Sequence, residues 1–427
     1  MTYTLYDLAL FWLVYSFLGW LAEACYFAIT RRGFYDRGVL SAPLVASYGI
    51  TCVLLILVLP ALGGHWLLQI VFATVIAMVI EALSNVFARQ FTDRVQWSAG
   101  AGGFGGGKRG FLLALLRGAG YYVTYLLVHP LLMAVELTLP ELVRRILVWM
   151  ALGLLAVDFL VSVYAMRTGG GEASRRKHRS DRGRLAARVS NFVWRRLRKA
   201  YPGIEQEAPD GGEVVFAKGL CWDKLILVFF VTALGGDLIE MCWVRLVSHL
   251  WMSRSSVLYG PFSFVWGLGS VVLTVALQPL AQKADRYGFF AGFVVGGVFE
   301  YMCSVFTELV FGKVFWDYSH MLLNIGGRTN LLFCFFWGVL AVFWVKFCYP
   351  MLSKGIESLP SIPGKVVIWV LVALMACNGA LTSLAMLRCE ARSADPQPAN
   401  RLEEFLDRQY DDDFMTRRWP NMRKVDR

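Results

Sequence analysis

Four glutamates lie inside strongly apolar stretches of the sequence, where an ionisable side chain is costly. They are Glu23, Glu81, Glu240 and Glu300. Acidic residues inside membrane spans usually face the bundle interior or a water-filled cavity, and they mark proton relays and ion pathways. The pattern therefore indicates a relay for a proton, a cation or a polar solute. The alternative interpretation is structural: each glutamate accepts hydrogen bonds from a neighbouring helix or pairs with an arginine near the interface.

Small residues accompany these four acids at helical spacing. The residues four positions earlier are Gly19, Ala77, Gly236 and Gly296, and those eight positions before Glu81 and Glu300 are Ala73 and Gly292. Positions four apart share one helix face, and small residues there let helices approach closely. We therefore expect these faces to pack against protein. Asp237, one turn before Glu240, and Asp158 are weaker candidates for the pathway, because neither has an acidic match in the other half.

No other pattern in the sequence supports catalysis or cofactor binding. Residues 102–108 fit the spacing of a phosphate-binding loop, but Arg109 stands where a Mg²⁺-binding Ser or Thr is needed, and no strand precedes it. The five histidines and nine cysteines lack metal-ligand spacing. We therefore predict no enzyme activity, no metal and no cofactor. Use of ATP would need a separate ATPase subunit.

The composition requires membrane spans to position these residues. The chain is 57% hydrophobic and 17% charged, against about 45–50% and about 25% in soluble domains. Segments of the roughly 20 apolar residues that a span needs recur along it. The candidate spans are Leu5–Thr30, Ser41–Ala61, Trp66–Phe87, Phe111–Val135, Leu142–Met166, Trp222–Leu250, Val257–Leu280, Gly288–Phe311, Leu331–Leu352 and Val366–Leu387.

The two halves of the chain resemble each other. Gly19 and Glu23 match Gly236 and Glu240 at one common separation along the chain, and Glu81 matches Glu300 at almost the same separation. A duplicated unit with an odd number of spans inserts upside down relative to its copy, as in many secondary transporters. We predict an all-α polytopic membrane bundle of about ten spans, in two inverted-topology repeats of five. The repeats would cover residues 1–166 and 221–388.

Two polar segments complete the predicted domain organisation. Residues 167–220 carry 13 Lys/Arg against 6 Asp/Glu. Apolar residues at helical spacing within them favour a basic amphipathic helix on anionic lipid head groups, with a plain solvated helix as the alternative. Residues 389–427 form a polar tail that we expect to be mobile. The formal charge of +11 is explained by membrane orientation, so no nucleic-acid partner is predicted.

Lysine and arginine placement predicts the orientation in the cell membrane. Basic loops around residues 31–37 and 89–109 alternate with nearly uncharged ones in the first half. By the positive-inside rule, the linker is cytoplasmic and the N-terminus outside. Glu23 and Glu81 would then lie toward the cytoplasm, and Glu240 and Glu300 toward the outside, in two acidic clusters.

One run of residues is specific enough to indicate a family. The second half carries Glu300, Trp316, Asp317, Tyr318, Ser319, Asn324, Gly327 and Arg328, and the first half carries Gly19, Trp20, Glu23, Arg37, Gly38, Leu40, Pro43, Tyr48 and Gly49. In these residues the chain resembles the CmpB-like family of type IV ABC-transporter permeases, with two copies in tandem. The resemblance implies a membrane component and names no substrate. The first copy lacks the closing run, since Ser98 and a glycine-rich stretch follow Trp97.

These observations lead to two functional hypotheses. The first is a permease that moves an unidentified small solute or ion, driven by ion coupling through the glutamates or by a separate ATPase. The second is a non-transporting membrane scaffold or regulator, whose basic linker recruits lipid or a cytoplasmic protein. Within the closing run, Trp316 and Tyr318 suit a membrane interface, and Asp317 is spaced to pair with Arg328.

Overall fold

The computed structural model describes residues 3–31, 42–89, 107–138, 140–168, 215–392 and 395–424. The chain divides into two compact units, residues 1–213 and 214–427, and each is described by itself. The amphipathic helix predicted for the linker, with its lipid contacts, lies outside the described residues. So do residues 102–106 of the glycine-rich stretch.

The first unit is a helical bundle. Its elements are α1 (Leu5–Arg31), α2 (Ala46–Val58) with the 3₁₀ turn η1 (Leu59–Leu62), α3 (Trp66–Arg89), α4 (Gly107–Val123), the π-helical turn η3 (Thr124–Val128), α5 (His129–Thr138) and α6 (Glu141–Thr168). Helix α1 packs on α2, α2 on α3, α3 on α4, and α6 returns to α1. Sequence neighbours therefore pack together, and the last helix closes the bundle.

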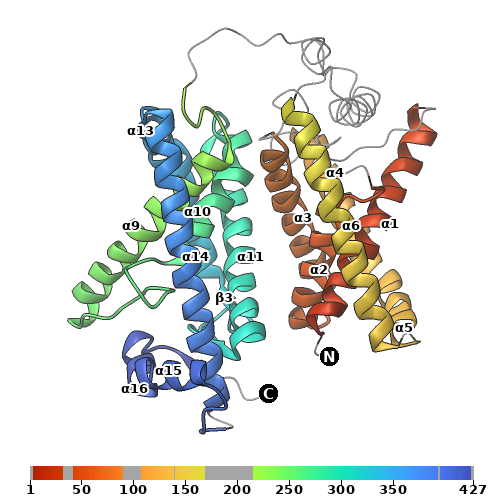
Figure 1. The fold of residues 1–427 in the computed structure, drawn as a ribbon. Helices are drawn as coiled ribbons and strands as arrows, with labels where there is room; N and C mark the ends of the chain where they lie inside the picture. Colours follow the sequence, from red (N-terminus) through yellow and green to blue (C-terminus); the bar gives the residue numbers. More distant parts are fainter. Residues whose placement is uncertain are drawn as a thin grey trace, which may run out of the picture. The chain divides into compact units, whose positions relative to one another are not determined.

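The second unit repeats this arrangement and adds to it. Its helices are α9 (Trp222–Ser248), α10 (Phe264–Leu277) with η4 (Gln278–Leu280), α11 (Asp285–Phe311), α12 (Leu331–Phe343), η5 (Trp344–Cys348), α13 (Tyr349–Glu357), α14 (Ser361–Arg392), α15 (Arg401–Gln409) and α16 (Asp412–Arg418). Its short strands are β1 (Lys313–Val314), β2 (Asn324–Ile325), β3 (Thr329–Asn330) and β4 (Arg423–Lys424). Helix pairs α9–α10, α10–α11, α11–α12 and α9–α14 correspond to those of the first unit (Figure 1).

Irregular turns recur at equivalent places in the two units. Pro130 follows the π-helical turn of the first unit, and Pro350, its counterpart in the repeat, follows that of the second. Proline lacks the N–H that would continue the helical ladder, so the preceding turn widens. The 3₁₀ turns that end α2 and α10 likewise contain Pro60 and Pro279. The duplication read from the sequence therefore extends to the irregular turns of the helices.

Eight of the described helices are long and apolar enough to cross a membrane, and the second helix of each unit is shorter. Residues 46–62 and 264–280 span only about 25 Å at 1.5 Å per residue, less than a hydrocarbon core of about 30 Å. The preceding loops explain this. Val45 N donates to Ser16 O at 3.1 Å, and Ser263 N to Ala233 O at 3.0 Å, so both helices begin near the middle of the first helix. The ten predicted spans thus correspond, in the described residues, to eight helices of spanning length and these two shorter ones.

The prediction of a mobile C-terminal tail is wrong for residues 395–424. Helices α15 and α16 bury Leu406, Met415 and Trp419 against the end of α14. Asp407 accepts hydrogen bonds from Arg388 and Arg392, each at 2.7 Å, and the Arg388 guanidinium holds the pKa of Asp407 below its ordinary value. Strand β4 pairs with β1. The few apolar residues of this segment are scattered in sequence and converge only when the short helices form.

Candidate functional site

Glu300 lies in the middle of α11 and is 7% exposed. Its carboxylate accepts hydrogen bonds from the hydroxyl of Tyr318 at 2.9 Å and that of Thr329 at 2.8 Å. The Trp337 side chain donates a third. Among the described residues, no lysine, arginine or histidine pairs with Glu300. Neutral donors therefore hold this carboxylate without a fixed counter-charge.

The loop of residues 312–330 reaches Glu300 by folding back along α11. Glu300 lies about three helical turns before the end of α11, roughly 16 Å along the axis. Tyr318 and Thr329 nevertheless contact it from beyond that end. Residues 312–330 therefore turn back along α11 to the middle of that helix. We refer to this segment as the re-entrant loop.

A tight hairpin shapes the tip of the re-entrant loop. Strands β2 and β3 pair around Gly326 and Gly327, whose φ angles are +57° and +69°. Side-chain-bearing residues rarely adopt such angles. A Cβ on Gly327 would also lie 2.9 Å from Oδ1 of Asp317. Glycine at 327 thus lets the hairpin close, with Asn324 Oδ1 accepting from Gly327 N at 2.9 Å.

The remaining residues of the run stabilise the loop in ways that differ from the sequence-based expectation. Trp316 Nε1 donates to Arg328 O at 2.9 Å, and Ser319 N donates to Asp317 at 2.9 Å. The predicted Asp317–Arg328 pair is wrong. Arg328 instead pairs with Glu308 on α11, because its side chain follows the loop back onto that helix.

Glu81, the counterpart of Glu300, has a different partner in the first unit. Arg117 Nη1 donates to Glu81 Oε2 at 2.8 Å, and their side chains are 42% and 31% exposed for Arg117 and Glu81 respectively. Arg117 is the repeat counterpart of Trp337, so an arginine occupies the position that the indole holds in the second unit. The loop after α3, residues 90–106, lies outside the described residues.

The other two glutamates are held by aromatic residues from the second helix of each unit. Trp266 Nε1 donates to Glu240 at 3.1 Å, and Arg254 pairs with the same carboxylate at 2.6 Å. Glu23 receives a hydrogen bond from the Tyr48 side chain. Tyr48 also interacts electrostatically with Glu81, and Tyr318 with Glu240. Each unit therefore brings its two glutamates near one tyrosine.

The small residues make room for these aromatic partners. A Cβ on Gly19 would lie 2.3 Å from the Tyr48 ring, and one on Gly236 would lie 2.3 Å from the Trp266 ring. A Cβ on Gly296 would lie 2.3 Å from the Trp337 ring. Gly292 packs on Ala341 of α12, while Ala73 and Ala77 are buried in the first unit. The small residue before each glutamate of the second unit thus admits the ring that binds it.

The two aspartates behave differently from each other. Asp158 accepts from Ala42 N at 2.9 Å, and Asn378, at the equivalent place in the second unit, accepts from Tyr259 N at 3.2 Å. These side chains hold the loop before the short second helix, so Asp158 has a structural counterpart that is not an acid. Asp237 is fully buried, and neither of its carboxylate oxygens has a hydrogen-bond partner among the described residues.

Several partners were missed in the sequence. Tyr48 matches Trp266, and Arg117 matches Trp337, at the same kind of separation that relates the glutamates, but only a search for non-identical pairs could have found them. Lys224 is 1% exposed and pairs with Glu357, near the start of α9. Because Lys224 lies close to the end of a span, where charged residues are usually exposed, its burial could not be recognised from the sequence.

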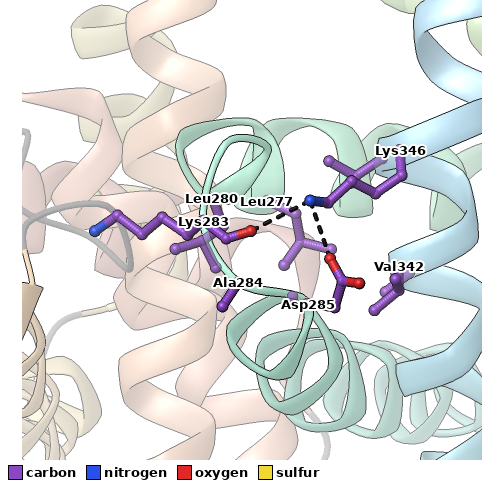
Figure 2. A pocket seen from close by; sticks show the side chains of 10 residues that line it. Leu277, Leu280, Lys283, Ala284, Asp285, Val342 and Lys346 are labelled. Carbon is purple, nitrogen blue, oxygen red and sulfur yellow. Dashed lines mark hydrogen bonds and ion pairs between the residues drawn. The ribbon is translucent and has the colours of Figure 1, made fainter.

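A second polar group lies at the other end of α11. Figure 2 shows Lys346 between Asp285, at 3.0 Å, and the carbonyl of Lys283, at 3.3 Å. The adjoining cavity measures about 10 Å³, which is room for at most about one water molecule. These contacts tie η5 to the start of α11, and the cavity is too small for a solute.

Comparison with known protein families assigns the chain to a family. The family described as "Putative ABC-transporter type IV" matches residues 10–163 and 227–383. The chain belongs to this family. One matching stretch falls in each unit, consistent with tandem copies of the type IV unit, and the chain is accordingly a multi-pass membrane protein of ABC-transporter type. No curated protein and no solved structure matches the chain.

Proposed function

We propose that the chain is the permease of a transporter for a small solute, and that Glu300 takes up and releases a proton or cation in its pathway. The burial of Glu300 among neutral donors carries this proposal. A buried carboxylate without a counter-charge is costly, so a proton or a mobile cation stabilises it. Ionisable groups held in this way inside membranes are commonly functional.

The contrast with the ion-paired glutamates supports the choice of Glu300. Glu81 and Glu240 each have an arginine partner, which already neutralises the carboxylate. The re-entrant loop adds support, since secondary transporters bind substrate and ions where helices are interrupted near mid-membrane. Glu23, Glu81 and Glu240 then belong to the pathway as fixed polar groups rather than as the exchanging one.

Orientation and partners complete the proposal. Five crossings in each unit insert the two units in opposite senses, with the N-terminus outside and the linker cytoplasmic. The basic linker binds anionic lipid, and family membership supports a separate ATPase subunit. Epitope tags in the linker and at the N-terminus test this orientation in intact cells: the N-terminal tag alone should bind antibody. Antibody binding to the linker tag would contradict it.

Solute uptake by proteoliposomes tests the function itself. Vesicles containing the full chain are given a mixture of small solutes under a pH gradient, a Na⁺ gradient, or ATP with any ATPase that co-purifies. Mass spectrometry then identifies what accumulates relative to protein-free vesicles. We expect at least one solute to accumulate, and Glu300→Gln to abolish this. If no solute accumulates under any of the three conditions, the permease proposal fails.

A further inference from the structure

The second unit contains a cavity of about 300 Å³ whose lining includes neither Glu240 nor Glu300. Its lining includes Asp237, Met241, Trp251, Met252, Pro261 and Arg418. These residues come from α9, the loop that follows it and α16, so the folded C-terminal segment forms part of the wall. The volume is at the lower end of the range of about 300–1,000 Å³ for small-molecule sites.

Asp237 gives the cavity a negative charge that no hydrogen bond satisfies. The side chain is 0% exposed, and no described group donates to either carboxylate oxygen. Glu240, one turn further along α9, already takes the nearby Arg254 as its partner. A buried carboxylate left without donors is costly, and an ammonium group supplies both the charge and the hydrogen bonds that it lacks.

Arg418 gives the cavity a positive charge at a fixed position. Its Nε and Nη2 atoms donate to Val257 O at 3.0 and 2.6 Å, and Nη2 also donates to Gly260 O at 2.8 Å. These bonds anchor the guanidinium. Nη1 has no hydrogen-bond partner among the described residues, and no described carboxylate forms a contact ion pair with Arg418, although the Asp237 charge is near enough to interact with it. One edge of the guanidinium therefore remains able to bind a carboxylate.

The rest of the lining is largely apolar. Met241 and Met252, which line the same cavity as Asp237, have flexible, unbranched side chains that adapt to a guest. Trp251, which is 68% exposed, adds an aromatic face at the rim. Within the described residues there is no cluster of acidic, histidine or cysteine side chains that could hold a metal ion, so an organic solute fits this lining better than a metal.

We propose that this cavity binds a small zwitterion of the amino-acid class. The ammonium group pairs with Asp237, the carboxylate with Arg418, and an apolar side chain packs against the two methionines and Trp251. A simple amine would bring its positive charge near Arg418 without a carboxylate to pair with that residue. A simple anion would likewise bring its negative charge near Asp237 without an amine. The proposal deepens the permease proposal and rests on it, because it names the class of solute.

Binding to the purified full chain in detergent tests the site without transport. Calorimetry compares L-leucine, L-methionine and L-phenylalanine with 3-methylbutylamine and 4-methylpentanoate, which are leucine without its carboxylate and without its amine. We expect at least one amino acid to bind at least tenfold more tightly than either analogue. Equal affinity for an analogue, or no binding of any amino acid, would overturn the proposal.

Variants assign the charges to the two residues. Asp237→Asn should weaken amino-acid binding at least tenfold without weakening that of 4-methylpentanoate, whereas Arg418→Gln should weaken the amino acid but not the amine. Asp223→Asn changes an acid on the same helix outside the cavity and is the matched control. Trp251→Ala, at an exposed rim position, should weaken binding severalfold even if Asp237→Asn proves unstable. Unchanged binding in these cavity variants would refute the site.

The two proposals can fail separately. Amino-acid binding that depends on Asp237 without uptake of any solute would overturn the permease and keep the site. Uptake of a solute that Asp237→Asn leaves unchanged would overturn the site and keep the permease.

Discussion

The two units place a glutamate at the same position of the third helix and surround it differently. In the first unit Glu81 pairs with Arg117. In the second unit Trp337 takes the place of the arginine, and the hydroxyls of Tyr318 and Thr329 complete the site. A duplicated fold can therefore keep one copy as an ion-paired support and leave the other free to exchange a proton or cation.

The largest expected effect comes from giving the second unit the partner of the first. Trp337→Arg places a cation beside Glu300, which removes its need for a proton or mobile cation. We expect the initial rate of solute uptake to fall at least about tenfold, equivalent to about 1.4 kcal/mol of activation free energy. Trp337→Phe removes the indole N–H without adding charge, so its initial rate of uptake should fall less. If Trp337→Arg takes up solute at the wild-type rate, the proposed functional difference between Glu81 and Glu300 is wrong.

The next effect concerns Gly296 and its counterpart Ala77, the small residues one helical turn before Glu300 and Glu81. Ala77 occurs in the first unit where Gly296 lies under the indole, and a Cβ on Gly296 would lie 2.3 Å from the Trp337 ring. Gly296→Ala should therefore lower the free energy of unfolding by about 1–3 kcal/mol through overpacking. Ala77→Gly should cost only about 0.5–1 kcal/mol. Unfolding in mixed micelles of SDS and mild detergent measures both; equal losses would argue against the packing difference.

The repeat and the four glutamates within apolar segments could be read from the sequence because both rest on identities. Glu23 and Glu240 match as glutamates, and apolar runs of sufficient length indicate the spans. The partners of the glutamates could not be read from the sequence, because the two copies carry different residue types at equivalent positions. These are Tyr48 against Trp266, and Arg117 against Trp337. A search for identical residues passes over such pairs.

The C-terminal segment and the short helices escaped for another reason. Leu406, Met415 and Trp419 are too widely spaced to give a periodic signal, and become a core only by packing on α14. The second helix of each unit has ordinary hydropathy, and its late start depends on loop-to-helix hydrogen bonds, such as Ser263 N to Ala233 O and Tyr259 N to Asn378 Oδ1. Tertiary contacts, not local preference, decide both features.

A smaller effect tests the hairpin that positions Thr329 in the second unit. Gly327→Ala puts a side chain at a φ of +69°, which costs about 1–2 kcal/mol, and crowds Asp317. We expect lower stability together with reduced uptake. Gly355→Ala, on a helix with open space around it, should be neutral or stabilising. If both variants behave alike, the hairpin does not position the site.

The smallest effect is the pH dependence of the C-terminal segment, which covers loops of the second unit. Binding to Arg388 lowers the pKa of Asp407 below its ordinary 3.8, so its contribution to docking is complete above that value. It is lost as the pH falls through the lower, folded-state pKa. Protease cleavage of the segment should rise only in acid, and Asp407→Asn should flatten this dependence. Increased cleavage on raising the pH from 5 to 8 would contradict the assignment.

The central claim is that Glu300 exchanges a proton or cation, whereas Glu81 does not. The most direct test compares initial uptake rates of Glu300→Gln and Glu81→Gln in proteoliposomes with the same amount of folded protein. We expect Glu300→Gln to lose at least tenfold and Glu81→Gln to stay within about threefold of the wild type, a difference of about 0.7 kcal/mol or less. Equal losses in the two variants, or full activity of Glu300→Gln, would contradict the account.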